Sequence, residues 1–171
     1  MIDVTIEVKG LEEVKRALAE FPSRIARKVL RSSVAAGGML LRGEIRNAAP
    51  VRSAGGMMKT GKGEMRGPGY LKKKIGARYR RRVSSFNEIH YSVGPTGQAF
   101  YGYFVEGGHK IGKRKRYGKG AGTDARGSVP PQPFMIPAFN RMTAPIIDRM
   151  KEGLIAGAMK EWAGVGFKTG V

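Results

Sequence analysis

FYGYFVEGGH, residues 100–109, and PPQPFMIPAFN, residues 130–140, flank an interval rich in glycine and basic residues that holds almost no apolar side chain. The aromatic run is too densely apolar for an exposed loop, so we expect it to pack against the sheet of this chain or against a neighbouring subunit. Residues 134–136 lie between two prolines, which predicts an extended anchor. The interval 109–132 cannot bury enough apolar area to fold alone and is predicted to be a flexible arm. Two anchors that tether a basic arm indicate a part of an assembly rather than an enzyme.

The composition limits the possible function classes. The 171 residues fit one domain, and an apolar content of 41% is ordinary for a folded protein. Lysine and arginine number 32 against 13 acidic residues, so the surface carries a positive field that attracts polyanions or acidic protein faces. No apolar run approaches the roughly 20 residues that span a bilayer, and the N-terminus has no signal-peptide pattern. We expect a soluble, unsecreted protein, without disulfides or thiolate metal sites because cysteine is absent.

The longest helical pattern runs from Pro22 to about Ala48. Its apolar and small residues fall on one broad side, and its basic residues form a narrow stripe on the other. This basic stripe consists of Arg24, Arg27, Lys28, Arg31, Arg42 and Arg46. The stripe is either a solvated face or a face toward an anionic partner, since a solvated face usually mixes signs and this one contains no acid. Glu44 projects into the apolar side, where it either pairs with a basic group across an interface or has a satisfied core or helix-end role.

Strand patterns occur in three places. Residues 2–8 alternate as a half-buried strand, and residues 11–21 then have helical spacing that ends at Pro22. Alternation between residues 71 and 83 predicts a strand with a row of cations on one face. That row consists of Lys72, Lys74, Arg78, Arg80 and Arg82. Residues 89–93 predict another strand, which forms an antiparallel hairpin with the first across residues 84–88.

A last helical pattern follows Pro137. The residues on its apolar side are Phe139, Met142, Ile146, Met150, Leu154 and Ala158. Because Pro145 interrupts the pattern, the helix either begins near Thr143 or is kinked. Taken together, the patterns predict an α+β fold in which a small antiparallel sheet packs against one long and one or two shorter helices. We expect a single domain over residues 1–164, with flexible basic loops at 53–69 and 109–132 and a C-terminal tail at 165–171.

No catalytic constellation is evident. Gly56, Gly61 and Lys62 imitate the spacing of a phosphate-binding P-loop, but Gly63 replaces the Ser or Thr that would bind magnesium. Neither histidine has a second ligand at metal-binding spacing, and no nucleophile elbow is present. We expect no enzymatic activity, no cofactor and no metal.

The order of several short segments resembles a known family. GLEEVKRALAEFP, NAAPVR, YLKKKI, YSVGP, FYGYFVEGGH and PPQPFMIPAF follow one another between residue 10 and about residue 150. This order is similar to that in the tail-component and neck proteins of long-tailed bacteriophages, a group that includes head-tail joining and tail-completion subunits and is similar to lambda-like minor tail protein Z. The arm at residues 110–129 is longer and more basic than that pattern requires.

The resemblance implies a non-enzymatic virion subunit, assembled in the bacterial cytoplasm, that forms a homo-oligomeric ring at the head-tail junction or upper tail. Its partners would be adjacent neck and tail proteins such as adaptor, stopper, tail terminator or tube, and genomic DNA in the lumen. The subunit-interface candidates are Phe100, Tyr101, Tyr103, Phe104, Glu106, Phe134, Met135, Ile136 and Phe139. The candidates for contact with DNA or an acidic partner are Lys72, Lys74, Arg78, Arg80, Arg82, Arg24, Lys28, Arg31, Lys113, Arg114, Lys115 and Arg116.

The alternative is a sequence-nonspecific nucleic-acid-binding protein that acts outside any particle. It would use the basic strand and the arm for phosphate contacts, with Tyr79 or Tyr117 stacking on bases. Steep salt dependence of DNA binding by a monomer or dimer would distinguish it from the ring subunit.

Overall fold

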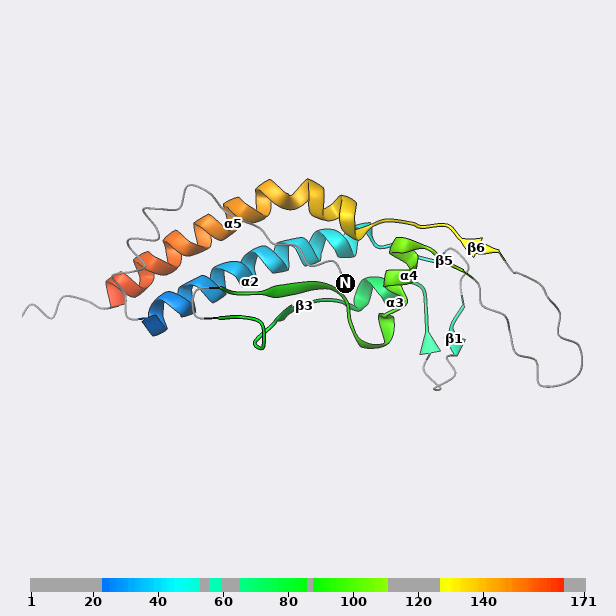
Figure 1. The fold of residues 1–171 in the computed structure, drawn as a ribbon, viewed down its shortest axis with the longest axis horizontal. Coiled ribbons are helices and arrows are strands. Elements are labelled where there is room, and N and C mark those ends of the chain that lie inside the picture. Colours follow the sequence, from blue (N-terminus) through cyan, green and yellow to red (C-terminus); the bar gives the residue numbers. More distant parts are fainter. Residues whose placement is uncertain (1–22, 53–55, 60–64, 86–87, 111–126, 165–171) are drawn as a thin grey trace, which may run out of the picture.

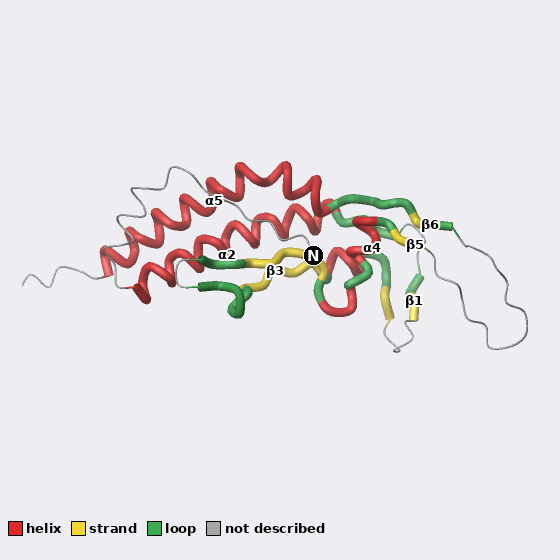
Figure 2. Tube along the Cα trace, viewed as in Figure 1, coloured by secondary structure: helices red, strands yellow, loops and turns green. Residues whose placement is uncertain are grey.

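A computed structural model describes residues 23–52, 56–59, 65–85, 88–110 and 127–164. Two long helices, α2 (Ser23–Ala48) and α5 (Met135–Gly164), lie side by side, and the hairpin of β3 (Ile75–Tyr79) and β4 (Tyr91–Pro95) lies along the other side of α2 (Figure 1). The layers are therefore α5, α2 and the sheet, as the tube view also shows (Figure 2). The predicted α+β class is confirmed. The predicted N-terminal strand and short helix, residues 2–21, lie outside the described residues.

Helix α2 has almost the bounds that its periodicity predicts, and it is covered on two sides. Val29, Ser33 and Gly37 are buried, and each of them contacts α5. The opposite side meets the sheet, where the Nε of Arg42 donates a hydrogen bond of 3.0 Å to the Ile75 carbonyl oxygen. Arg42, one residue of the basic stripe, is therefore turned toward the sheet of its own chain and not toward solvent or a partner. A long arginine side chain can cover a sheet while its guanidinium group bonds a polar atom of that sheet.

Small residues bring α2 and α5 close together. The hydroxyl of Ser33, 1% exposed, donates a hydrogen bond to the Met150 carbonyl oxygen, and Gly153 packs against Ser33. Toward the other end of the contact, Arg141 on α5 pairs with Glu44 on α2 at 2.8 Å. Of the two alternatives predicted for Glu44, pairing across an interface is thus replaced by an ion pair within the chain.

The β3–β4 hairpin confirms the predicted antiparallel pairing, with Ile75 opposite Pro95 and Tyr79 opposite Tyr91. Its first strand is shorter than predicted, because residues 70–73 form a short helix, α3 (Tyr70–Lys73). Leu71 and Ile75 are both buried, and their spacing of four residues fits a helical turn. A strand would also have placed Lys73 on that buried face.

The predicted row of five cations on one strand face is therefore wrong. Only Arg78 lies in β3. Lys72 lies in α3 and Lys74 at its C-terminal cap. Arg80 and Arg82 lie in a turn after β3. The N–H groups of Val83 and Ser84 close this turn by donating hydrogen bonds to the Arg80 carbonyl oxygen. The cations are distributed over both ends of the hairpin.

Helix α5 begins earlier than predicted. It starts at Met135 and continues through Pro145, so the predicted start near Thr143 is wrong. Pro137 lies in the first turn, where a helix needs no N–H donor, so proline is tolerated there. Residues 134–136 thus form the start of a helix instead of an extended anchor. The predicted apolar side is confirmed, since Ile146 and Leu154 are buried.

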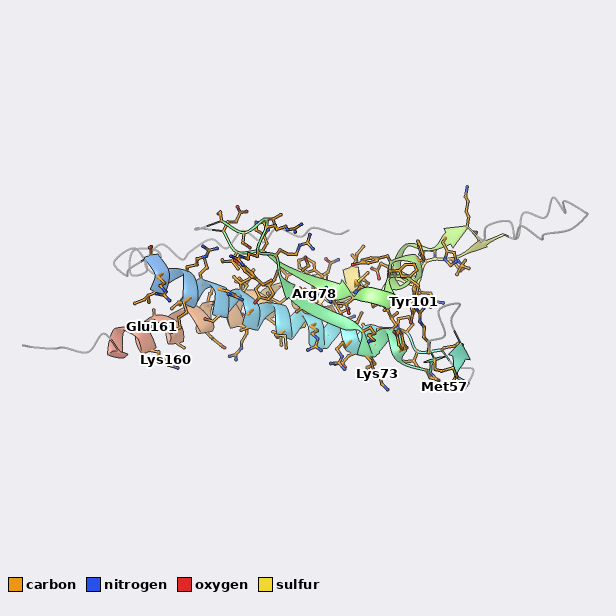
Figure 3. The ribbon with its side chains drawn as sticks, turned by 90° about the horizontal axis from the view of Figure 1, so that it is seen from below. Met57, Lys73, Arg78, Tyr101, Lys160 and Glu161 are labelled. Atoms are coloured by element: carbon orange, nitrogen blue, oxygen red, sulfur yellow. The ribbon has the colours of Figure 1, made fainter. Side chains whose placement is uncertain are left out.

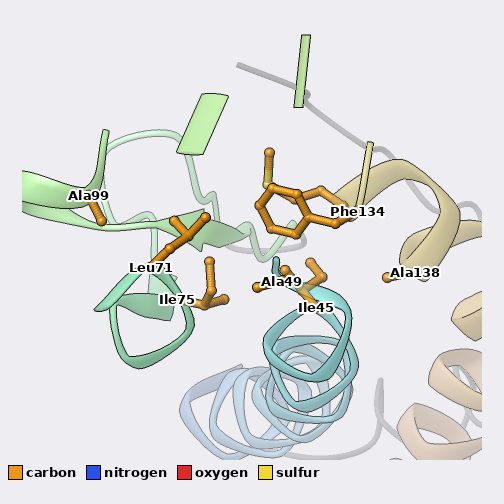
Figure 4. Packing of buried hydrophobic residues seen from close by; sticks show 8 residues of the cluster. Ile45, Ala49, Leu71, Ile75, Ala99, Phe134 and Ala138 are labelled. Atoms are coloured by element: carbon orange, nitrogen blue, oxygen red, sulfur yellow. The ribbon is translucent and has the colours of Figure 1, made fainter. Parts of the chain in front are cut away.

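The main core lies at the end of α2, where α3 and the start of α5 meet it (Figure 4). Its buried residues are Ile45, Ala49, Leu71, Ile75, Ala99, Phe134, Met135 and Ala138. Beside it are a 3-10 turn, η1 (Gly97–Ala99), and the short helix α4 (Gly102–Gly107). No helix in the described ranges is both long enough and apolar enough to cross a membrane.

The described parts of the two predicted basic loops contain short antiparallel pairs. β1 (Met58–Lys59) pairs with β2 (Met65–Arg66), and β5 (His109–Lys110) pairs with β6 (Ser128–Val129). Residues 60–64, with most of the P-loop imitation, lie outside the described residues, as do residues 111–126 with Lys113, Arg114, Lys115 and Arg116.

Candidate assembly surface and basic groove

The Glu106 carboxylate binds the N-terminus of α5. Its Oε2 accepts hydrogen bonds from the backbone N–H groups of Phe134 at 2.7 Å and Met135 at 2.8 Å, and its Oε1 accepts one from Ile136 at 2.9 Å. Glu106 is only 7% exposed. A helix N-terminus leaves its first N–H groups without partners inside the helix and carries positive partial charge, so a carboxylate satisfies both. Glu106 therefore fastens α4 to α5.

Backbone contacts next to Glu106 support this connection. The Gln132 N–H donates a hydrogen bond of 2.8 Å to the Val105 carbonyl oxygen. Gly108 ends α4 with a φ of 70°, and a Cβ there would lie 2.8 Å from the Val129 carbonyl oxygen. Glycine is required at this position both for its backbone conformation and for the space. The two predicted anchors thus contact each other within one chain.

This contact corrects part of the predicted subunit interface. Glu106, Phe134 and Met135 are buried in the core of their own chain, at 7%, 3% and 6% exposure. The correction follows from the fold, because the start of α5 needs both an anionic cap and apolar cover. Tyr101 is partly buried under the Arg66 guanidinium, which lies 5.3 Å from its ring centroid, and burial raises the pKa of Tyr101. Phe139 is also partly buried.

The remaining aromatic residues of this region are exposed. Phe100, Tyr103 and Phe104 are 56%, 42% and 48% exposed, and Ile136 is 47% exposed. The rings of Phe100 and Phe104 meet edge to face with centroids 6.0 Å apart, and the His109 ring lies 5.6 Å from Phe104. We call Phe100, Tyr103, Phe104 and His109 the aromatic surface. Tyr103 and Phe104 lie in α4, Phe100 precedes it and His109 follows it, and Glu106 connects α4 to the start of α5.

A second exposed apolar patch lies on α5. Ile155 is 46% exposed and Met159, one helical turn later, is 67% exposed; we call these two residues the α5 patch. The α5 patch lies near Val29, because Gly157, between its two residues in sequence, packs against Val29. The aromatic surface lies near Ile45, because Phe134, beside the Glu106 cap, belongs to the same core cluster as Ile45. Val29 and Ile45 lie 16 positions apart in α2, which corresponds to about 24 Å of helix. The aromatic surface and the α5 patch therefore lie toward opposite ends of the long axis (Figure 1).

Basic side chains gather in an open groove of about 740 Å³ between the first turns of α2 and the end of the hairpin. Its lining residues are Arg24, Arg27, Lys28, Arg31, Ser32, Ala35, Tyr79, Arg81 and Tyr91. We call this the basic groove. Five of the nine residues are cationic and none is acidic.

Tyr79 contacts two of the arginines that line the basic groove. Arg27 donates a hydrogen bond of 3.3 Å to the Tyr79 hydroxyl, and the Arg31 guanidinium carbon lies 4.3 Å from the Tyr79 ring centroid. The hydrogen bond from Arg27 is the largest cause of a lowered pKa of Tyr79, and the charges of Arg27 and Arg31 act in the same direction. The Tyr91 ring lies 5.8 Å from that of Tyr79.

The positive charge of the groove is mostly uncompensated. Lys28 pairs with Glu161 of α5 at 2.5 Å. Among the residues that the structure describes, no carboxylate lies within 4.0 Å of the basic nitrogens of the groove's four arginines. Like charges this close repel one another, so a bound anion would lower the energy of the groove.

The structure separates the predicted cations into two groups. Arg24, Lys28 and Arg31 lie together in the basic groove, and the exposed side chains of Arg78, Arg80 and Arg82 belong to the adjoining hairpin. Lys72 and Lys74 lie at the other end, where the Lys74 ammonium is 5.5 Å from the Tyr70 ring centroid. Figure 3 shows the two ends of the molecule, with Lys73 of α3 near Met57 at one end and Glu161, the partner of Lys28, near the start of α2 at the other.

Sequence reasoning missed three of the cationic and aromatic groove residues as site residues. Arg27 was assigned only to the helix stripe and Tyr91 only to a strand. Arg81 fell within a predicted strand that in fact ends at Tyr79. The unbroken run Arg80–Arg81–Arg82 was the available signal, since three successive cations fit a turn better than a half-buried strand.

Two further observations bear on the site. No group of three or more metal-binding side chains occurs in the described ranges. Comparisons with models of protein families, with curated proteins and with solved structures give no match.

Proposed function

We propose that this chain is a structural subunit of a bacteriophage virion, which forms a ring at the head-tail junction or upper tail, joins or completes the tail and lets DNA pass. The order of the sequence segments suggests the family. The observation that carries the assembly role is the aromatic surface, which is exposed and lies around α4, the helix that Glu106 connects to α5. An exposed cluster of large aromatic side chains is typical of a protein–protein interface.

The positions of the two apolar patches favour a ring. A ring needs heterologous contacts, in which one patch of a subunit meets a different patch of the next. The aromatic surface and the α5 patch lie toward opposite ends of the long axis of the molecule, and both are exposed. In our proposal the aromatic surface of one copy therefore covers Ile155 and Met159 of the next.

The role is non-enzymatic and needs no cofactor. Beyond further copies of the chain, the partners would be neighbouring neck or tail proteins such as an adaptor, a stopper, a tail terminator or a tube. The subunit would assemble in the bacterial cytoplasm and function in the virion.

The ring contact is tested by replacing Phe100 and Phe104 together with serine. We expect the double variant to lose the higher oligomers of the wild-type protein in light scattering coupled to size exclusion. Because both side chains are exposed, the free energy of unfolding should change by less than about 1 kcal/mol. The control is the double variant Val51→Ser and Val83→Ser, which removes two side chains of similar exposure, 52% and 54%, outside both patches.

Oligomers that survive Phe100→Ser and Phe104→Ser would contradict the aromatic contact. Equal loss of oligomers in the control would also contradict it, since the effect would then come from general surface apolarity. In an additional variant, Ile155→Ser with Met159→Ser, the same loss is expected because these residues form the opposite half of the contact.

A further inference from the structure

We propose that the basic groove binds the phosphodiester backbone of nucleic acid, independently of base sequence. The groove is built within one chain, so this inference goes beyond ring formation and does not require it. It concerns the first turns of α2 and the end of the β3–β4 hairpin, which neither apolar patch includes.

The positive charge of the basic groove is preorganised. Arg27 and Arg31 are both held by Tyr79, one through its hydroxyl and one over its ring. Arginines that are already fixed lose less conformational freedom when they bind an anion, and their planar groups fit phosphate oxygens in pairs. Part of the conformational entropy that anion binding would otherwise remove from these side chains is therefore already lost in the folded protein.

The extent of the basic surface indicates which kind of anion it binds. The cations do not end at the groove, because the exposed Arg80 and Arg82 flank the groove residue Arg81 in the turn after β3. A track of this kind fits an extended polyanion rather than a single phosphate. Duplex DNA presents one negative charge per about 1.7 Å of its axis, far more densely than an acidic peptide, whose carboxylates are spread over flexible side chains. The observations therefore favour nucleic acid over an acidic protein segment.

The groups that line the groove are suited to the nucleic-acid backbone and not to the bases. One face of Tyr79 is already covered by Arg31, so that face is not available for stacking on a base. The groove offers guanidinium, ammonium and hydroxyl groups, which bind phosphate oxygens without reading sequence. Binding should therefore be salt-dependent and nearly equal for duplexes of different sequence.

The experiment measures binding of fluorescently labelled duplex DNA by anisotropy over a series of salt concentrations. The groove variant carries Arg24→Gln, Arg31→Gln and Arg81→Gln, three exposed cations of the groove. The control variant carries Lys72→Gln, Lys73→Gln and Lys110→Gln, which removes the same charge from α3 and β5.

We expect the groove variant to bind at least about tenfold more weakly at low salt, and its salt slope to fall by about 2–3, since each lost phosphate contact lowers the slope by about one. The control should lose less than about threefold. Circular dichroism and urea unfolding of both variants check that they are folded.

Equal losses in the two variants would overturn the proposal, because binding would then follow net charge alone. Failure of the wild-type protein to bind DNA at physiological salt would also overturn it. Tighter binding of a labelled poly-glutamate peptide than of DNA would assign the groove to an acidic protein instead. Light scattering of the groove variant separates this proposal from the ring, since its oligomers should match those of the wild type.

Discussion

Replacing Glu106 with alanine is expected to lower the free energy of unfolding by about 3–5 kcal/mol. The substitution removes the acceptor of three backbone N–H groups at 2.7, 2.8 and 2.9 Å. Two of these donors belong to Phe134 and Met135, which are buried, so water cannot easily replace the carboxylate. The same change leaves the N-terminal charge of α5 without its counterpart and releases α4 from the core.

Urea unfolding followed by circular dichroism measures this loss. Glu106→Gln should fall between the wild type and Glu106→Ala, because the amide keeps one acceptor oxygen and the shape of the side chain. The matched control is Glu152→Ala, which removes an exposed carboxylate that pairs with Arg149 at 3.1 Å. Its effect should stay below about 1 kcal/mol. A Glu106→Ala variant as stable as Glu152→Ala would show that the cap is not needed.

Two identical substitutions in helix interiors are expected to change stability in opposite directions. Gly157→Ala should lower the free energy of unfolding by about 1–3 kcal/mol, although alanine is the better helix former. Its Cβ would lie 2.7 Å from the Cγ1 of Val29, which is 2% exposed. Because valine is stiff about its first side-chain bond, it cannot turn away, and the two helices must separate.

Gly43→Ala should instead raise the free energy of unfolding by about 0.5–1 kcal/mol. Gly43 lies in the interior of α2, is exposed, and a Cβ there meets nothing within 4 Å. Urea midpoints of the two variants, compared at equal slopes, measure the contrast. If both variants were stabilised, the close contact between α2 and α5 would be refuted.

Much of the fold could be predicted from periodicity. The long helix from residue 23 to 48, the antiparallel pairing of the hairpin and the apolar side of α5 follow from side-chain spacing, because each of these patterns has one dominant period. Residues 71–75 could not be assigned in this way. Leu71 and Ile75 fit both a strand and a helical turn, and only Lys73 between them favours the helix.

The candidate site was harder to predict, because it depends on contacts between distant segments. The exposure of Phe100 and Phe104 and the burial of Phe134 are not distinguished by residue type, and the arrangement follows from where Glu106 meets α5. A lone glutamate in an aromatic run, 28 residues before the N–H group of Phe134, gives no local sign of its partner. The basic groove likewise joins the start of α2 to the end of a hairpin about 50 residues later.

The central claim is that copies of this chain form a closed ring through the aromatic surface. Negative-stain electron microscopy of the purified full-length protein tests it most directly, with the Phe100→Ser and Phe104→Ser variant imaged beside it. We predict closed rings for the wild-type protein and single subunits for the variant. Single subunits of wild-type protein at every concentration up to its solubility limit, or rings formed equally by the variant, would contradict the claim.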